Sequence, residues 1–363
     1  MITLKKIIFP AIFVLLLSAC STENNQQDEQ TEQNEEEATE VFSRQAEVIA
    51  PNLNVPWNIN KHDNTFYLSQ RPGNIIKVDG TNGTKTEQNI EVTKDILQTG
   101  EGGFLGFILA PDFYKSREAY AYHTYEQQGE VLNRIIVLKL NQNTWTEERI
   151  LLEGIPGGRI HNGGRIKIGP DGKLYATAGD AGNADNAQNL ETLAGKILRM
   201  NLNGTIPADN PFEDSYVYSY GHRNPQGLAW DTDGTFYSSE HGQTAHDEIN
   251  LIEPGRNYGW PVIEGDETAP GMVSPIYQTG DTTWAPSGIA IKDRKIYVSN
   301  LRGEQIRIFN LNDNSVSTFF ENAGRMRDVL IEGDTLYTIT NNRDGRGTPR
   351  KGDDKLIKIA IEE

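Results

Sequence analysis

Apolar and polar residues alternate over short runs through most of the chain. From Val41 onward these runs are rich in β-branched and aromatic residues, and turns containing Gly, Asp or Asn separate them. No segment keeps the spacing of apolar positions that a long amphipathic helix needs. Short alternating runs with frequent turns are typical of strands joined by hairpins. The pattern therefore predicts an all-β fold.

One phrase recurs along this region: an apolar strand, a turn with Asp or Gly, and a strand that contains Tyr. It occurs six times, beginning at Trp57, Leu105, Gly164, Gly227, Gly288 and Arg327. Successive starts lie between 39 and 63 residues apart, which suits four-stranded propeller blades with loops of varying length. The repeat predicts a six-bladed β-propeller over residues 42–363. A β-sandwich is the alternative, but it would not need so many similar hairpins.

The first twenty residues have the features of an export signal. Lys5 and Lys6 precede the apolar stretch Ile7–Ala19, which is too short for a comfortable membrane span. Small residues then precede Cys20, the single cysteine of the chain, as at a lipoprotein cleavage site. We expect residues 1–20 to be a lipoprotein signal peptide and Cys20 to be lipidated, which would anchor the protein to the outer face of the cell membrane. An ordinary signal with an incidental cysteine is the alternative. Either way no internal disulfide is expected, so the fold must depend on its core.

Residues 21–41 predict a flexible tether. The stretch Ser21–Glu40 is polar and acidic and has no aromatic or basic residue, so it cannot bury enough apolar surface to fold. The whole chain carries a formal net charge of −17. An acidic surface repels nucleic acid and anionic lipid, so we expect no nucleic-acid partner. The charge says little about a small, sugar-like ligand.

Polar and charged residues precede the repeated phrases, where the strands of a propeller would enter its centre. A histidine, an acid, three arginines, an amide and an aromatic residue stand at these positions. They are Glu101, His161, Arg223, Asn224, Trp284, Arg325 and Arg327. Arginines are rarely buried without a partner, so several that converge on one axis predict an anionic ligand.

Six motifs in this order resemble the soluble quinoprotein glucose dehydrogenase family, and more closely its aldose sugar dehydrogenase (glucose/sorbosone dehydrogenase) branch. The motifs are "HNGGRIKIGPDGKLYATAGD", "YGHRNPQGLAW", "SSEHGQTAHDEINLI", "GRNYGWP", "APSGIA" and "GRMRDV". The resemblance covers roughly Val48 to Ile361. It implies a six-bladed propeller that uses pyrroloquinoline quinone (PQQ) and Ca²⁺ to oxidise the C1 hydroxyl of aldoses to lactones, with electrons passed to an external acceptor.

The resemblance also implies catalytic roles. His161 matches the family's base, and a neutral imidazole suits that work near pH 7. Asp180 matches the acid that orients the histidine, although it could instead only cap the following turn. Arg223 matches the arginine beside the reactive quinone carbonyls, and Asn224 matches its neighbouring amide.

Cofactor and metal ligands follow from the same resemblance. Arg325 and Arg327 match the pair that binds the cofactor carboxylates; residues i and i+2 of an extended segment face the same way, so both could reach one ligand. Surface ion pairs are the alternative for these two arginines. The carbonyls of Gly242 and Gln243 match the ligands of the cofactor's Ca²⁺, since calcium prefers oxygen donors.

A further ion is a weaker expectation. Glu248 could bind a structural Ca²⁺ with the carbonyl of Tyr258, or it could pair with Arg256.

Three departures from the family's pattern bear on the function. Glu101 stands where the family has Gln, and a carboxylate beside an anionic quinone is unfavourable unless it is protonated or paired. Arg302 is the nearest candidate for a cofactor-binding lysine. Trp284 and Tyr277 are the candidates for the aromatic cover of the cofactor.

These departures leave two alternatives to the sugar dehydrogenase. One is a propeller without redox chemistry that binds carbohydrate or a protein. The other is a lactonase, which would need a central calcium held by side-chain carboxylates and amides. The arginines at the axis argue against the lactonase.

Overall fold

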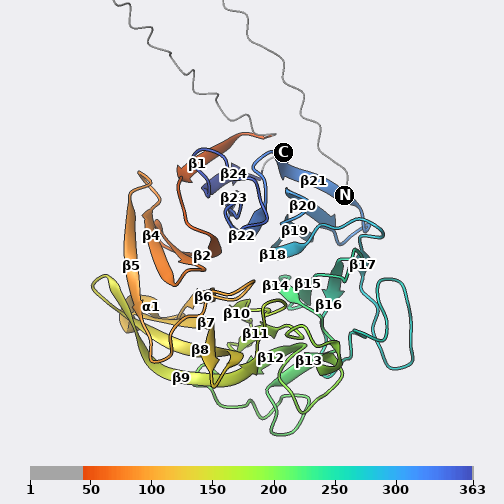
Figure 1. The fold of residues 1–363 in the computed structure, drawn as a ribbon. Coiled ribbons are helices and arrows are strands. Elements are labelled where there is room, and N and C mark those ends of the chain that lie inside the picture. Colours follow the sequence, from red (N-terminus) through yellow and green to blue (C-terminus); the bar gives the residue numbers. More distant parts are fainter. Residues whose placement is uncertain (1–43, 362–363) are drawn as a thin grey trace, which may run out of the picture. The chain divides into compact units, whose positions relative to one another are not determined.

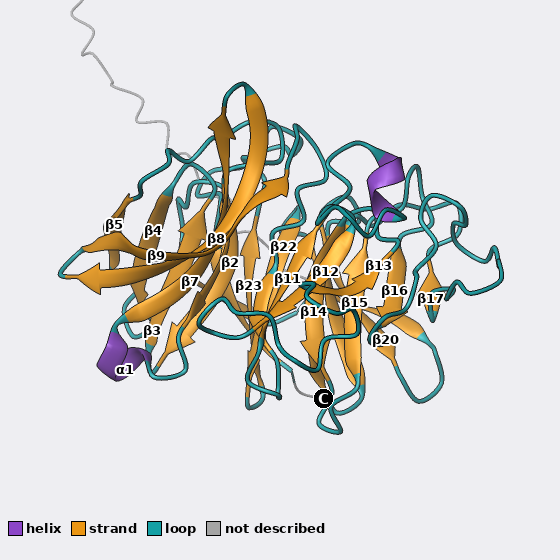
Figure 2. Cartoon of the chain, turned by 90° about the horizontal axis from the view of Figure 1, so that it is seen from below, coloured by secondary structure: helices purple, strands orange, loops and turns teal. Residues whose placement is uncertain are grey.

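The computed structural model describes residues 44–361, all of which belong to the unit Val41–Glu363. The predicted signal peptide, Cys20 and the whole of the predicted tether lie outside these residues. Within 44–361 no helix is long and apolar enough to cross a membrane. Helical structure there is limited to α1 (Phe113–Ser116) and the 3-10 turn η1 (Ala184–Ala187), drawn in purple in Figure 2.

The strands form five sheets, four of them with four strands and one with eight. The first four-stranded sheet contains β22 (Met326–Glu332), β23 (Thr335–Thr340), β24 (Leu356–Ala360) and β1 (Ala46–Ala50). The second contains β10 (Ile166–Ile168), β11 (Leu174–Ala178), β12 (Lys196–Met200) and β13 (Val217–Tyr220). The third contains β14 (Pro225–Trp230), β15 (Phe236–Glu240), β16 (Glu248–Leu251) and β17 (Tyr277–Gln278). The fourth contains β18 (Pro286–Lys292), β19 (Lys295–Asn300), β20 (Gln305–Asn310) and β21 (Val316–Glu321).

The eight-stranded sheet is made of two antiparallel runs joined at their edges. One run is β2 (Pro56–His62), β3 (Thr65–Gln70), β4 (Asn74–Asp79) and β5 (Lys85–Glu91). The other is β6 (Phe104–Leu109), β7 (Glu118–Gln127), β8 (Glu130–Asn141) and β9 (Thr144–Pro156). The two runs meet where β5 pairs with β9 in parallel. The expectation of an all-β fold is confirmed, and the arrangement of the sheets is that of a β-propeller.

Each repeated phrase of the sequence forms one antiparallel hairpin: β2–β3, β6–β7, β10–β11, β14–β15, β18–β19 and β22–β23. The first strands of these hairpins contact one another in a closed order, β2–β6–β10–β14–β18–β22 and back to β2. Figure 1 shows them around a common centre. The segments that enter these strands therefore converge, as the sequence predicted for the residues that precede each phrase.

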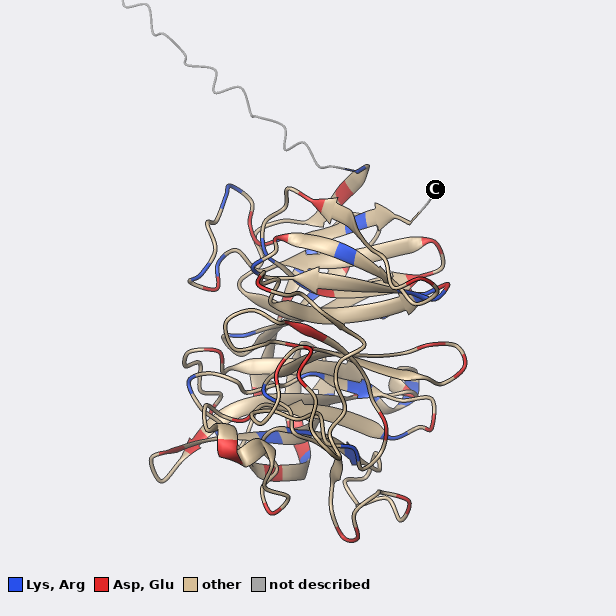
Figure 3. Ribbon diagram, turned by 90° about the vertical axis from the view of Figure 1, so that its right-hand side faces the viewer, with Lys and Arg blue, Asp and Glu red and all other residues tan. Residues whose placement is uncertain are grey.

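Apolar side chains pack between neighbouring sheets. One core cluster joins β2, β6, β7 and β10–β13 through residues such as Trp57, Leu105, Ile166 and Leu198. The interior also contains buried ion pairs, among them Arg134 with Glu147 at 2.7 Å and Arg165 with Asp328 at 3.1 Å. Charges on the side drawn in Figure 3 are interspersed, with acidic and basic residues mostly in loops. That side has no continuous basic stripe of the kind that binds nucleic acid.

Candidate active site

A cavity of about 530 Å³ opens where the entering segments converge. Seven of the residues predicted to act at the site line it: Glu101, His161, Arg223, Gly242, Gln243, Arg302 and Arg325. A smaller cavity of about 20 Å³ adjoins it and shares Glu101, His241, Leu301 and Arg346 with the larger one. Asn224 and Arg327 line this second cavity. The lining is strongly polar, which suits a charged ligand rather than an apolar one.

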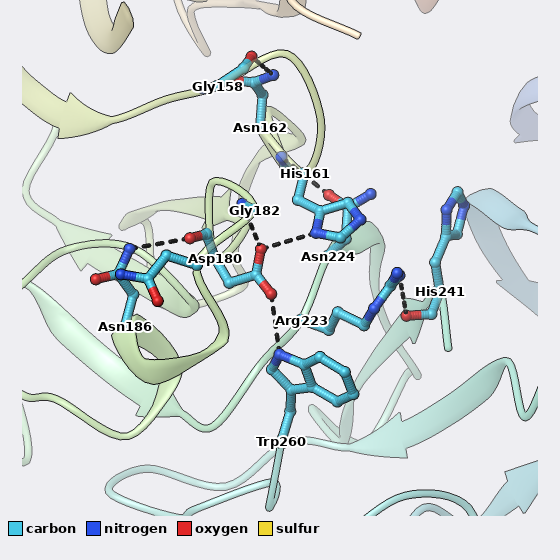
Figure 4. A network of polar contacts seen from close by, with 12 residues as sticks. Gly158, His161, Asn162, Asp180, Gly182, Asn186, Arg223, Asn224, His241 and Trp260 are labelled. Carbon is cyan, nitrogen blue, oxygen red and sulfur yellow. Dashed lines mark hydrogen bonds and ion pairs between the residues drawn. The ribbon is translucent and has the colours of Figure 1, made fainter. Parts of the chain in front are cut away.

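His161 and Asp180 form a close pair at the edge of the cavity (Figure 4). His161 Nδ1 lies 2.7 Å from Asp180 Oδ1, so the carboxylate accepts the Nδ1–H and leaves Nε2 with its lone pair. Trp260 Nε1–H donates to the other carboxylate oxygen at 2.9 Å. The imidazole is therefore fixed in one orientation and one tautomer, as a base needs to be.

Asp180 also caps the turn that follows it. Its Oδ1 accepts the backbone N–H of Gly182 at 2.7 Å. Asp180 therefore both orients His161 and caps the turn, the two roles that the sequence had offered as alternatives. Gly179, just before it, has no room for a larger residue, because a Cβ would lie 2.1 Å from the His161 carbonyl oxygen. This close approach is what brings the end of β11 against His161.

Arg223 is held mainly through its backbone. Its N–H and that of Asn224 both donate to Glu240 Oε1, and Glu240 Oε2 lies 2.8 Å from His222 Nδ1. The Arg223 guanidinium lies 5.3 Å from the ring centre of Trp260 and donates through one terminal nitrogen to the His241 carbonyl at 3.3 Å. His222 is fully buried, so it supports the site without entering it.

The i, i+2 spacing of Arg325 and Arg327 predicted that both side chains face the same way. In the structure they line two different, adjoining cavities. Arg325 lines the larger cavity and pairs with Asp344 at 2.8 Å, whereas Arg327 lines the smaller cavity and donates to Gln226 and Ser287. The strand register shifts between Met326 and Asp328, and this irregularity breaks the alternation of side chains. Arg325 is 5% exposed and Arg327 is 7% exposed. Because both side chains are buried, the alternative that they form surface ion pairs is wrong.

Positive charge accumulates around both cavities. Burial, together with the neighbouring Arg325, Arg71 and Arg165, lowers the pKa of Arg327 to about 9 against the opposing effect of Asp344. Burial also lowers the pKa of Arg71. The Nε atoms of Arg71, Arg223, Arg325 and Arg327 are buried without a hydrogen-bond acceptor among the described residues. Buried donors without partners are costly, so the site is built to receive oxygen acceptors.

The Glu101 carboxylate is paired, so its negative charge near an anionic ligand is compensated. Its Oε1 accepts from Arg346 at 2.8 Å, and its Oε2 accepts the backbone N–H of His161 at 2.9 Å. Burial alone would raise the pKa of Glu101, but the His161 N–H and the Arg346 guanidinium outweigh it and hold the pKa below its ordinary value. Glu101 is therefore an ionised carboxylate with its charge already compensated.

The segment around Gly242 is shaped by Asp247. Asp247 Oδ1 accepts the Gly242 N–H at 3.0 Å, and Oδ2 accepts the N–H groups of Trp284 and Ala285 at 2.6 and 2.8 Å. A Cβ on Gly242 would lie 1.9 Å from the Ala245 carbonyl oxygen, so the tight turn requires glycine. Asp247 thus fixes the chain where Gly242 and Gln243 border the cavity.

Glu248 and Tyr258 line one small cavity together with two further carboxylates, Glu240 and Glu264. Burial and the nearby Glu240 raise the pKa of Glu248 to about 8. Arg256 pairs with Glu253 at 3.7 Å, so the expected alternative of a Glu248–Arg256 pair is wrong. Among residues 44–361 no group of three or more His, Cys, Asp or Glu side chains is placed to bind a metal ion. Any calcium here would need backbone carbonyls among its ligands.

Comparison with known proteins assigns the chain to a family. The family model described as Glucose / Sorbosone dehydrogenase matches residues 53–356. The chain belongs to the glucose/sorbosone dehydrogenase family. The resemblance expected from the sequence motifs is confirmed.

Two relatives are informative. Quinoprotein glucose dehydrogenase B of Acinetobacter calcoaceticus is 37% identical over 63% of this chain, and the match spans only 55% of that relative's length. Aldose sugar dehydrogenase YliI of Escherichia coli (strain K12) is 27% identical over 82% of this chain and 90% of its own. The solved structure of the PQQ-bound aldose sugar dehydrogenase from Streptomyces coelicolor is 38% identical, covers 87% of this chain and 98% of its own, and has a TM-score of 0.81.

The glucose/sorbosone dehydrogenase site of this chain differs from the sequence expectation in its aromatic residues. Trp284 is 5% exposed and packs on Tyr277, whose ring also contacts Phe309; neither Trp284 nor Tyr277 lines a cavity described above. Two other aromatic residues lie at the site. Trp57 lines the smaller cavity with its ring centre 5.6 Å from the Arg327 guanidinium, and Trp260 binds Asp180 and lies against Arg223. Arg302 does border the larger cavity, but it is exposed at its mouth.

Several residues of the site were missed by reasoning from the sequence: Arg71, His241, Asp247, Asp344 and Arg346. His241 is a partial exception, because it stands beside Gly242 in the motif that suggested calcium binding. Its ring nitrogen Nε2 is buried without a partner among the described residues, and burial lowers its pKa. Asp247 lies in the same motif, whereas Arg71, Asp344 and Arg346 lie in turns that carry no motif, so no signal in the sequence marked those three.

Proposed function

We propose that this protein is a six-bladed propeller enzyme that binds PQQ and Ca²⁺ and oxidises the C1 hydroxyl of aldoses to lactones. The six blades are the four four-stranded sheets and the two halves of the eight-stranded sheet, which the β5–β9 pairing joins. Family membership and the His161–Asp180 pair beside the arginine-rich cavity support the proposal. The single observation that carries it is the set of buried arginine Nε atoms without acceptors.

The donors present fit PQQ, which carries three carboxylates and two quinone oxygens. Arginine binds planar oxyanions through two parallel hydrogen bonds. Arg325 borders the larger cavity, and Arg327 and Asn224 border the adjoining one. We assign cofactor binding to these residues together with Arg223, Glu101 and Arg302. Bound PQQ would supply a two-electron acceptor for the hydrogen on C1 of the sugar.

His161 would act on the sugar hydroxyl. Since Asp180 accepts the Nδ1–H, Nε2 can accept the C1 hydroxyl proton and the carboxylate then stabilises the imidazolium that forms. Arg223 borders the same cavity and would stabilise negative charge that develops opposite the base. Trp260 holds Asp180 and Arg223 in place, because its indole N–H donates to Asp180 and its ring lies against the Arg223 guanidinium.

Calcium would be held by the carbonyls of Gly242 and Gln243, which border the same cavity. These are oxygen donors of the kind that Ca²⁺ prefers. A second Ca²⁺ at Glu248 and Tyr258 would displace the proton that Glu248 otherwise keeps at neutral pH, since its pKa is raised to about 8. The bound cation would then compensate the negative charges of Glu248 and the neighbouring Glu240.

The remaining parts of the proposal concern partners and place in the cell. Lipid on Cys20 would anchor the enzyme to the outer face of the membrane, and residues 21–41 would separate the anchor from the propeller. Electrons would leave for an external acceptor that reaches the open cavity. No nucleic-acid partner is proposed, because the acidic net charge of −17 would repel one.

The test is to add PQQ and Ca²⁺ to the purified protein and to follow the reduction of a dye with a panel of aldoses. The proposal expects saturable PQQ binding by absorbance and sugar-dependent reduction that requires PQQ. PQQ binding without turnover on any aldose would favour the non-catalytic binding propeller instead. No PQQ binding at all would overturn the proposal.

A further inference from the structure

Glu101 connects two distant parts of the chain through its two carboxylate oxygens. Oε2 accepts the His161 backbone N–H, and Oε1 accepts from Arg346, which is 245 residues away in sequence. Glu101 itself precedes β6, whereas Arg346 lies between β23 and β24. The carboxylate is only 23% exposed although Arg346 is 54% exposed. Both residues line the central cavity, and the contact between them continues to the backbone of His161.

His161 has a backbone conformation that needs external support. Its φ is +56°, in the left-handed region that residues other than glycine rarely adopt. Its carbonyl oxygen accepts the Ala181 N–H at 3.2 Å, and its N–H donates to Glu101. These two bonds hold the peptide groups on either side of the strained residue. Without Glu101 the peptide group before His161 would lose its acceptor.

We propose that Glu101 is a positioning residue for the His161 base and that Arg346 keeps Glu101 in place. This inference rests on the proposed function, in which His161 Nε2 accepts the sugar proton. Glu101 acts through the His161 backbone and Asp180 through the ring, so the base is fixed at both ends. A small displacement of a catalytic group is enough to slow a reaction strongly.

The loop that carries Arg346 also connects the base to the cofactor arginines. Asp344 in this loop accepts the Arg346 N–H at 2.9 Å through Oδ1 and pairs with Arg325 through Oδ2 at 2.8 Å. A ligand that moves Arg325 would therefore also affect the position of Glu101, because Asp344 and Arg346 connect the two residues. Hydrogen bonds and an ion pair thus connect the His161 backbone, through Glu101, Arg346 and Asp344, to Arg325.

A carboxylate performs this work better than an amide would. Each Glu101 oxygen accepts one bond, and both partners are donors. A glutamine could present its single oxygen to His161 or to Arg346, but its NH₂ group would face the remaining donor. Glu101→Gln should therefore keep one link and lose the other, whereas Glu101→Ala should lose both.

The test measures two quantities in the full-length protein. Hydrogen–deuterium exchange of the peptide that contains His161, without added PQQ, reports the N–H bond directly. We expect Glu101→Ala to speed exchange at this position by about tenfold or more. With PQQ and Ca²⁺ saturating, kcat per bound PQQ should fall roughly 10- to 100-fold while KM for the sugar changes little. Arg346→Gln should have a smaller effect in the same direction, and adding it to Glu101→Ala should change nothing further.

The Glu118–Arg149 pair offers a matched control. It is an exposed bidentate pair at 3.1 Å with side-chain exposures of 20% and 40%, and it lies away from the cavity. Glu118→Ala should leave both the exchange at His161 and kcat unchanged. If Glu101→Ala behaves like Glu118→Ala in both measurements, the inference is wrong. Should the wild type lack PQQ-dependent turnover, the proposed function fails, and the exchange measurement alone decides whether Glu101 supports His161.

Discussion

His161 Nδ1 and Asp180 Oδ1 lie 2.7 Å apart, and the second oxygen of Asp180 is occupied by the Trp260 indole N–H. This arrangement leaves one acceptor free at the histidine, the Nε2 lone pair. Proton transfer by a side chain depends on such control of orientation and tautomer. The consequences can be tested one residue at a time.

Replacing Asp180 tests the orientation of the base. Asp180→Asn removes the negative charge that would stabilise the imidazolium, and its NH₂ group would face the donor on His161 or on Trp260. We expect kcat for aldose oxidation to fall roughly 10²- to 10⁴-fold, with the Kd of PQQ unchanged within a few-fold. Steady-state dye reduction and a PQQ titration measure both. Equal turnover in the variant and the wild type would refute the role of Asp180.

Replacing Arg327 tests cofactor binding. Its pKa of about 9 reflects burial among other arginines, a state that carboxylates of a ligand would relieve. Arg327→Gln should weaken PQQ binding by about 10- to 100-fold, as expected for loss of a hydrogen-bonded charge. Titration followed by absorbance gives the Kd. Arg294→Gln is a suitable control, because Arg294 is 47% exposed and pairs with Asp231; an equal loss of affinity in both variants would contradict the assignment.

Replacing Asp247 tests the calcium-binding segment. Asp247→Asn keeps one oxygen acceptor but loses the charge that gathers the N–H groups of Gly242, Trp284 and Ala285. We expect the Ca²⁺ concentration needed for half-maximal reconstitution with PQQ to rise by about tenfold. Reconstitution across a calcium series in chelator-buffered solution measures this. An unchanged calcium requirement would argue that Asp247 only supports the fold.

Stability at acid pH should depend on His123. Burial and Arg134 lower the pKa of His123 to about 4, and Arg134 Nε donates to His123 Nε2 at 2.8 Å, so the ring is neutral in the folded state. Between about pH 6.5 and 4 the unfolded chain binds this proton and the folded chain does not, so the free energy of unfolding falls as the pH falls.

The expected contribution of His123 is about 2 kcal/mol between pH 6.5 and 4.5. Urea unfolding at both pH values should show a smaller loss in His123→Gln than in the wild type. His62 provides the control, because its side chain is 39% exposed and it pairs only with the exposed Asp63. A loss in His123→Gln as large as that in the wild type would mean that other groups set the acid limit.

The hairpins could be predicted from the sequence because each depends on local alternation and a turn. "GRIKIGPDGKLYATAGD" alternates in this way, and β10 and β11 pair with Ile166 opposite Ala176. The proximity of His161 and Asp180 followed from the same hairpin. The fold class and this pair were therefore within reach of the sequence.

Contacts between distant turns could not be predicted. Trp260 reaches Asp180 across 80 residues, and Arg346 reaches Glu101 across 245. The periodicity of apolar residues predicts single hairpins, but it does not predict which loops contact one another at the centre of the propeller. The placement of Arg325 and Arg327 in two adjoining cavities could not be predicted for a different reason, because the register shift between Met326 and Asp328 removes the regular alternation of side chains.

Comparison of wild-type protein with His161→Ala tests the central claim most directly. Both proteins are loaded with PQQ and Ca²⁺, the bound cofactor is quantified by absorbance, and aldose-dependent dye reduction is measured per bound PQQ. The account predicts equal PQQ occupancy and a fall in turnover of roughly 10²- to 10⁴-fold in His161→Ala. Equal turnover per bound PQQ in the two proteins, or no PQQ-dependent turnover in the wild type, would contradict it.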